Sequence, residues 1–202
     1  RSASSSLMLA AQMDLLRETG AGLLSLLLAP PRHLLALTRR TRALAEYADL
    51  QRDALPALDT ESLSHAPLAP LRDLMLCCGD ASGVEHALRI VRALRARHPQ
   101  LRVRGFGGRR LAAEGMELWE PLADLNVMGF RDVAAQLPLF VRCVHRFSCE
   151  IRERRPDAVL LVDYPGLNRV LLRIAARQRL PVVDLIEPQL LAWAPWRVRA
   201  YR

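Results

Sequence analysis

A single carboxylate stands where a run of apolar residues ends. Residues 158–162 are apolar throughout, and Asp163 follows them directly, ahead of Pro165 and Gly166. An apolar run of this length, bounded by turn residues, predicts a parallel strand that is buried on both faces. Ligands of open α/β sheets bind at the carboxyl ends of such strands. Asp163 is therefore a candidate catalytic base; the alternative is that it caps the next helix or stabilises the turn.

Two glycine-containing loops follow other predicted strands. Residues 79–83 (Gly-Asp-Ala-Ser-Gly) join a strand to a helix, where backbone N–H groups can bind a phosphate or a sugar hydroxyl. The loop does not match the dinucleotide pattern GxGxxG, and Asp80 would repel a pyrophosphate. Residues 105–108 (Gly-Phe-Gly-Gly) precede Arg109, which could pair with a phosphate. For each loop, a plain turn is the alternative interpretation.

A regular alternation of strands and helices must position these residues. From residue 72 onward, apolar runs with strand character alternate with segments of helical period, joined by short loops. This alternation predicts a parallel sheet with helices on both faces. The predicted strands are 73–78, 101–105, 117–119, 158–162 and 181–186, and the predicted helices are 84–97, 109–114, 130–154 and 168–177.

The first part of the chain predicts a helical extension. Residues 7–28 are leucine-rich and helix-prone, and residues 34–50 form a second predicted helix that carries arginines. The uncharged stretch 19–31 is too short for the roughly 20 residues of a membrane-spanning helix. The two helices could lie on a membrane surface with arginines at the head groups, or pack on the main domain or on a partner.

Composition limits the function without identifying it. The 202 residues are 51% hydrophobic and 25% charged, which is enough apolar sequence for a packed core. The formal net charge of +8 is carried by 29 arginines and no lysine. An arginine excess suits nucleic acid, a phosphorylated substrate or an acidic membrane, but the arginines are scattered and select none of these. We divide the chain into a helical extension (1–52), a linker (53–71) and an α/β domain (72–202).

The cysteines do not form a recognisable metal or redox motif. Cys77, Cys78, Cys143 and Cys149 include no CxxC pair and have no histidine at a spacing that suits zinc. Cys77 and Cys78 lie within a predicted strand, so we expect buried thiols and a reducing compartment.

Five short motifs occur in order along the α/β domain. They are Gly79-Asp-Ala-Ser-Gly83, Gly105-Phe-Gly-Gly-Arg-Arg-Leu-Ala-Ala-Glu-Gly115-Met-Glu117, Leu125-Asn-Val-Met-Gly-Phe130, Asp163-Tyr-Pro-Gly-Leu-Asn168 and Pro188-Gln-Leu-Leu-Ala-Trp193. Together they resemble the amino-terminal half of lipid-A-disaccharide synthases, which are GT-B-fold glycosyltransferases. The resemblance covers residues 72–202. It implies a Rossmann-like acceptor-binding domain, here preceded by the helical extension and lacking the carboxyl-terminal donor domain.

The resemblance implies a specific reaction. Family members join UDP-2,3-diacylglucosamine to 2,3-diacylglucosamine 1-phosphate, release UDP and form a β-1,6 disaccharide. Inversion needs a base for the acceptor 6-hydroxyl, and the family's DxPxxN motif puts that role on Asp163. The resemblance implies no cofactor, no metal site and no nucleic-acid partner. The implied substrate-binding residues are Gly79, Asp80, Ser82, Gly83, Gly107, Gly108, Arg109, Met128, Asn168 and Trp193.

The chain departs from the family pattern in its first motif. The family has Gly-Glu-x-Ser-Gly-Asp, whereas this chain has Asp80 for the glutamate and Val84 for the final aspartate. Glu85 is one residue late and would point about 100° away on a helix. Because the donor domain of the family holds the nucleotide sugar, we expect the 202 residues to be inactive alone.

The resemblance also implies a location. It predicts a cytoplasmic enzyme bound peripherally to the inner face of the inner membrane of a Gram-negative bacterium. Phe130, Val133, Leu137, Phe140 and Val141 repeat at helical spacing, facing either the membrane or the core. Two other functions stay open, namely a non-catalytic lipid- or partner-binding domain and a GT-B enzyme with another acceptor.

Overall fold

The computed structural model describes residues 2–27, 70–125 and 137–185. Of these, residues 2–19, 70–125 and 137–185 belong to one compact unit. The elements in chain order are α1 (Ser2–Leu27), β1 (Asp73–Cys78), α5 (Ala81–Arg97), β2 (Arg102–Phe106), α6 (Arg109–Ala113), β3 (Glu117–Glu120), the 3₁₀ helix η1 (Leu122–Asp124), α8 (Leu137–Glu153), β4 (Ala158–Val162), α9 (Pro165–Arg177) and β5 (Val182–Leu185).

The strands of the described residues form one parallel sheet. Their order is β3-β2-β1-β4-β5, and every neighbouring pair is parallel. The chain winds outward from β1 to β3, then returns to place β4 on the other side of β1. The strand order therefore reverses between β1 and β4, at the centre of the sheet. The predicted parallel sheet is confirmed.

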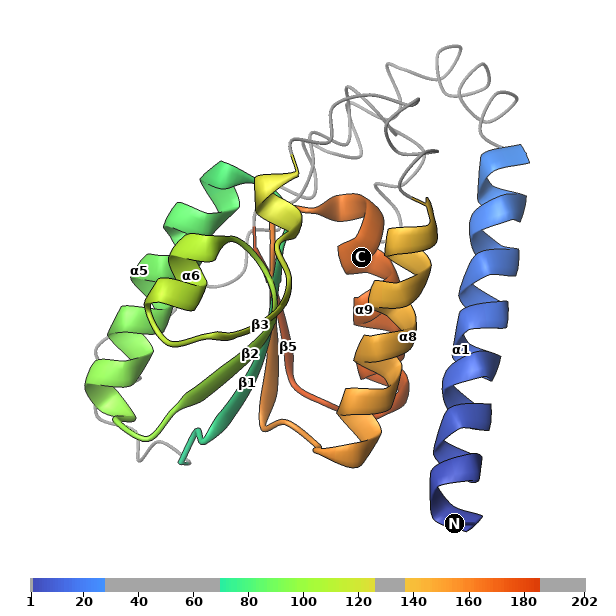
Figure 1. The fold of residues 1–202 in the computed structure, drawn as a ribbon, viewed down its shortest axis with the longest axis horizontal. Helices are drawn as coiled ribbons and strands as arrows, with labels where there is room; N and C mark the ends of the chain where they lie inside the picture. Colours follow the sequence, from blue (N-terminus) through green and yellow to red (C-terminus); the bar gives the residue numbers. More distant parts are fainter. Residues whose placement is uncertain (1, 28–69, 126–136, 186–202) are drawn as a thin grey trace, which may run out of the picture. The chain divides into compact units, whose positions relative to one another are not determined.

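Helices cover both faces of this sheet, as predicted. Figure 1 shows α5 and α6 on one face and α8 and α9 on the other. Alternate side chains of β1 serve the two layers: Met75 and Cys77 belong to the core under α8 and α9, whereas Leu74 and Leu76 belong to the core under α5. Every residue of β1 is buried. This two-sided burial explains why the strand is apolar at consecutive positions.

The predicted helices differ from the structure mainly at their first turns. We expected one helix to start at Val84, but α5 starts at Ala81, because Asp80 caps it and accepts a hydrogen bond from the Gly83 amide at 2.6 Å. We expected another helix to start at Asn168, but α9 starts at Pro165. Proline suits the first turn of a helix, because the N–H that it lacks would have no partner within the helix.

Part of the sequence prediction lies outside the described residues. This holds for the second helix of the extension (34–50), for most of the linker, and for Phe130 and Val133 of the apolar repeat. Of the other members of that repeat, Leu137 is 56% exposed, whereas Phe140 packs against the core under α8 and α9.

Gly105 lets β2 pass close to β1. Its φ is +138°, and a Cβ at this position would lie 2.1 Å from the Leu76 carbonyl oxygen. The pairing of β2 with β3 shifts register between Gly105 and Phe106. A glycine is required here, because any side chain would meet the backbone of the central strand.

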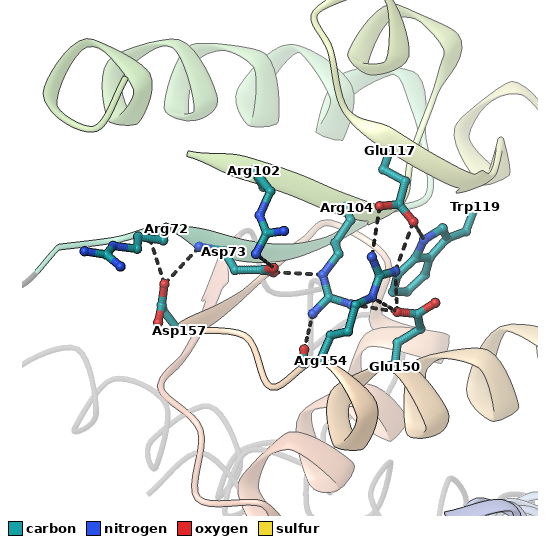
Figure 2. Close-up of polar contacts among 9 residues, drawn as sticks. All are labelled: Arg72, Asp73, Arg102, Arg104, Glu117, Trp119, Glu150, Arg154 and Asp157. Atoms are coloured by element: carbon teal, nitrogen blue, oxygen red, sulfur yellow. Dashed lines mark hydrogen bonds and ion pairs between the residues drawn. The ribbon is translucent and has the colours of Figure 1, made fainter. Parts of the chain in front are cut away.

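A buried arginine ties the amino-terminal ends of the central strands to α8 (Figure 2). The Arg104 side chain of β2 is 2% exposed. Its Nε donates to Asp73 Oδ1 at 2.8 Å and its Nη1 donates to Glu150 Oε2 at 2.9 Å. Its Nη2 donates to the Arg154 carbonyl, and the guanidinium carbon lies 5.8 Å from the centre of the Trp119 ring. The Arg104 charge is therefore fully paired inside the fold.

The α1 helix docks on α8 and α9 through its acidic side. Asp14 and Glu18 are 3% and 6% exposed. Asp14 accepts hydrogen bonds from Ser148 at 2.7 Å and from Arg152 at 2.5 Å, and Arg177 reaches both acids. Burial raises the pKa of Asp14, but the bonds from Ser148 and Arg152 and the arginine charges outweigh burial and hold it below its ordinary value. The ion pairs of Asp14 therefore persist to a lower pH than those of an ordinary aspartate would.

We predict that Arg104→Met lowers the free energy of unfolding by about 3 to 5 kcal/mol, because it removes the buried cationic partner of the Asp73 and Glu150 carboxylates. Arg102→Met is the matched control. Arg102 is on the same strand and pairs with the same Asp73 at 3.3 Å, but its side chain is 73% exposed. Its loss costs about 0 to 1 kcal/mol. Urea unfolding followed by circular dichroism compares the two variants, and equal losses would contradict the prediction.

Candidate active site

The loops that follow β1 and β4 meet where the strand order reverses. The last residues of these strands, Cys78 and Val162, are register partners. From there the chain leaves β1 toward α5 on one face and leaves β4 toward α9 on the other (Figure 1). Diverging connections of this kind open a crevice at the carboxyl ends of the strands, where α/β proteins bind ligands. The structure thus brings residues 79–83 and 163–168 together.

Asp163 has an unusual backbone conformation. Its φ is +40°, in the left-handed region that aspartate and asparagine enter more easily than other non-glycine residues. Its amide donates a hydrogen bond to the Leu185 carbonyl at 3.0 Å, which ties the turn to the end of β5. The side chain is partly buried. The backbone hydrogen bond therefore fixes the position of the Asp163 carboxylate at the carboxyl end of the sheet, because the side chain itself is short.

The Asn168 side chain forms hydrogen bonds with the backbone of this turn. The residue is 1% exposed. With the amide assigned so that its oxygen faces donors, it accepts from the amides of Val162 and Tyr164, each at 3.3 Å. These residues flank Asp163 on both sides, so Asn168 fixes the conformation of the backbone that carries the carboxylate.

Ser82 lies between two carboxylates. Its Oγ is 3.2 Å from Asp163 Oδ2 and 2.9 Å from Asp80 Oδ1. A hydroxyl has one hydrogen, so it donates to one of the two oxygens at a time. Asp80 Oδ1 also accepts the Gly83 amide as the cap of α5. The site therefore holds two acids and a single shared hydroxyl donor.

This crowding changes the proton affinity of Asp163. Burial raises its pKa above the usual range, and the charge of the neighbouring Asp80 raises it further. The hydrogen bond from Ser82 and the charge of His86 act in the opposite direction without reversing the shift. A carboxylate with a raised pKa is a better proton acceptor in a reaction near neutral pH. Sequence reasoning missed His86, whose position on α5 carries no motif.

Gly79 leaves room for an aromatic ring. A Cβ at Gly79 would lie 2.1 Å from the Tyr164 ring, so only glycine permits this packing. The ring also lies 6.0 Å, centre to centre, from that of Phe140 on α8. Burial raises the pKa of Tyr164 to about 12, which keeps its phenol neutral. Tyr164 was not among the predicted site residues, although it sits inside the Asp163–Asn168 motif.

The second glycine loop adjoins the first. A Cβ at Gly108 would lie 3.1 Å from Val84 Cγ2, next to Gly83. Gly107 is held by its carbonyl, which accepts the Ala123 amide at 3.0 Å. The Arg109 amide donates to Asp124 at 3.1 Å, and the Arg109 side chain is 85% exposed. The Arg109 Nε also pairs with Asp124 Oδ2 at 3.5 Å, and the rest of the exposed guanidinium can reach an anion at the carboxyl end of the sheet.

Three other residues of the sequence prediction are accounted for differently. Glu85 forms an ion pair with Arg110, so it is engaged on the surface of α5. Met128 and Trp193 lie outside the described residues.

Comparison with known proteins identifies the family. The family model described as lipid-A-disaccharide synthetase matches residues 74–202. The lipid-A-disaccharide synthase of Syntrophus aciditrophicus is 36% identical over 126 residues, which are 62% of this chain and 33% of that protein. The synthase of Myxococcus xanthus is 36% identical over 129 residues (64% and 34%), and that of Bradyrhizobium diazoefficiens is 35% identical over 133 residues (64% and 34%).

No solved structure matches this chain. The chain spans about a third of the length of the curated relatives it matches. The match of residues 74–202 covers the whole sheet beyond the first residue of β1 and both loops of the candidate site. The chain belongs to the lipid-A-disaccharide synthetase family.

Proposed function

We propose that this chain is the acceptor-binding part of a glycosyltransferase that forms lipid A disaccharide. In this proposal the complete protein transfers a diacylglucosamine unit from UDP-2,3-diacylglucosamine to 2,3-diacylglucosamine 1-phosphate. The observation that carries the proposal is the position of Asp163, at the reversal of the strand order and opposite Asp80 and Ser82, in a chain of this family.

Asp163 acts as the general base. Its carboxylate takes the proton of the acceptor 6-hydroxyl while that oxygen attacks the anomeric carbon of the donor. The bond from the anomeric carbon to the UDP oxygen breaks, UDP leaves with the electron pair, and the configuration inverts. The raised pKa of Asp163 supports this role, because proton transfer is most effective when the base has a pKa close to the working pH.

The neighbouring residues tune and position the base. Asp80 raises the proton affinity of Asp163 through its charge, and Ser82 stabilises the ionised form by donating to it. Asn168 is a positioning residue, because it binds the backbone on both sides of Asp163. The exposed Arg109 side chain is a candidate partner for the 1-phosphate of the acceptor, since a guanidinium binds phosphate through paired donors.

The substrates place the reaction at a lipid surface. Both carry acyl chains, so we propose that the complete protein binds peripherally to the inner face of the inner membrane. Within the part of the chain that the structure describes, no helix has the length and apolar character needed to cross a membrane.

We predict that Asp163→Asn in the complete protein lowers kcat by about 10²- to 10⁴-fold, because the amide cannot accept the proton. Asparagine also tolerates a positive φ, so the turn survives the change. The stability at neutral pH does not fall, since the variant removes the repulsion from Asp80. Disaccharide formation by the purified protein, with thermal unfolding as the folding check, tests this.

Asp157→Asn is the matched control for that variant. Asp157 precedes β4 as Asp163 follows it, and it caps the other end of the sheet by accepting the amides of Arg72 and Asp73 at 2.7 and 2.9 Å. Its loss affects stability and leaves kcat unchanged. Full turnover in Asp163→Asn would exclude Asp163 as the base.

A second prediction concerns the proton affinity of Asp163 in the 202-residue chain itself. Asp80→Asn lowers the pKa of Asp163, because it removes a neighbouring negative charge, whereas Ser82→Ala raises it, because it removes a donor to the ionised form. Carboxyl carbon chemical shifts followed by NMR across a pH titration report both changes. Glu85→Gln is the control: it neutralises an acid of the same helix that is already paired with Arg110. Shifts of the same sign in Asp80→Asn and Ser82→Ala would refute the arrangement.

A third prediction concerns catalysis by the 202 residues on their own. Because the chain spans about a third of its relatives, we propose that it holds the acceptor but not the nucleotide-sugar donor. The isolated 202 residues are then inactive, and mixing them with UDP-diacylglucosamine and acceptor yields no disaccharide. Product formation above the level of the Asp163→Asn chain would contradict this.

A further inference from the structure

The solvent side of α1 carries several large apolar side chains among its polar ones. Met8, Leu9, Met13 and Leu16 are 52%, 61%, 46% and 67% exposed, which is high for side chains of this kind. Leu9, Met13 and Leu16 follow one another at intervals of four and three residues, so they lie on one side of the helix over a length of about 10 Å. We call these four residues the outer face of α1.

The outer face cannot turn inward, because the opposite side of α1 is locked. Glu18 is nine residues from Leu9 and therefore points about 180° away from it. It forms ion pairs with Arg173 and Arg177, while Asp14 pairs with Arg152 and Arg177. Rotating the helix to bury the leucines would break these pairs and leave buried charges unmatched. The apolar side chains of the outer face are thus exposed because the ion pairs of Asp14 and Glu18 fix the rotation of α1.

The ion pairs of Asp14 and Glu18 also determine the charge on the solvent side of α1. The α1 sequence has three charged residues, Asp14, Arg17 and Glu18. Both acids are buried against arginines of α8 and α9, so Arg17, which is exposed, supplies the charge on the solvent side. The outer face is therefore apolar with a positive neighbour and no acid. The whole chain has a formal net charge of +8.

This combination selects the occupant of the outer face. A second copy of the chain would bring the same positive charge to the contact and would be repelled. A surface of anionic lipid head groups attracts Arg17 and accepts the leucine and methionine side chains among its acyl chains.

We propose that α1 lies flat on an anionic lipid surface with its outer face inserted. This assigns to a helix that precedes the family match at residue 74 the contact that holds the protein at the membrane. It deepens the peripheral location proposed above, but it rests on α1 and is independent of the role of Asp163. In the full chain, the lock between α1 and the helices α8 and α9 would join the membrane contact to the domain that carries the candidate site.

The test is flotation of the full 202-residue chain with phosphatidylcholine vesicles, with and without phosphatidylglycerol. We expect binding to the anionic vesicles that weakens with added salt. The triple variant Leu9→Gln, Met13→Gln, Leu16→Gln lowers the partition coefficient by about tenfold or more. Arg17→Gln lowers it by about fivefold, the effect of one arginine at a charged surface.

A matched triple variant controls for general loss of hydrophobicity. Leu125, Leu137 and Val183 are 39%, 56% and 52% exposed and lie outside α1. Replacing each with glutamine leaves vesicle binding unchanged. If both triple variants lose binding equally, the assignment to α1 is wrong.

Two further measurements identify other occupants. If the α1 triple variant lowers the free energy of unfolding in the absence of vesicles, another segment of the chain covers the outer face and the proposal fails. If the wild type sediments as a dimer, the variant as a monomer and neither binds vesicles, the occupant is a second copy. Asp163→Asn binds vesicles to the same extent as the wild type, so a failure of the catalytic proposal is distinguishable from a failure of this one.

Discussion

The pairing of β1 with β4 is the constraint on which the rest of the structure depends. These strands are adjacent in space but are separated in sequence by two other strands, and the chain leaves them toward opposite faces of the sheet. Hydrophobic burial on both faces holds them in register, and the register sets the separation of Asp80 and Asp163. Two carboxylates placed so close are unfavourable in isolation. The stability of the sheet offsets this cost, as is common where strain and function coincide.

Arginine has an internal role in this protein as well as an external one. Arg104 is enclosed by acids and a carbonyl at one end of the sheet, and Arg152 and Arg177 neutralise the acids of α1. The guanidinium suits these positions because its five donors satisfy several acceptors at once. The excess of arginine in the sequence is thus partly structural, which explains why its distribution along the chain indicates no single partner.

The strands and the loops at their ends could be predicted from the sequence, because two-sided burial makes each strand a continuous apolar run. Helix starts are predicted less accurately: the sequence pattern predicts a helix from Val84, whereas Asp80 caps α5, which begins at Ala81. The Arg104 cluster and the orientation of α1 could not be predicted, since both depend on partners far away in the sequence. The helical period of α1 shows which residues share a side, but it does not show which side is buried. An apolar side is usually the buried one, whereas here the ion pairs bury the side that carries Asp14 and Glu18.

The positive φ of Asp163 has an evolutionary consequence. Few residue types adopt this conformation without strain, and asparagine and glycine are among them. A single substitution can therefore remove the proposed proton acceptor while every strand, the Asn168 hydrogen bonds and the Tyr164 packing remain. A fold can be retained after its activity is lost. A relative that became inactive in this way would differ from an active one at this position and keep the other motif residues. The identity of residue 163 is the first thing to inspect in any member that is assigned an activity.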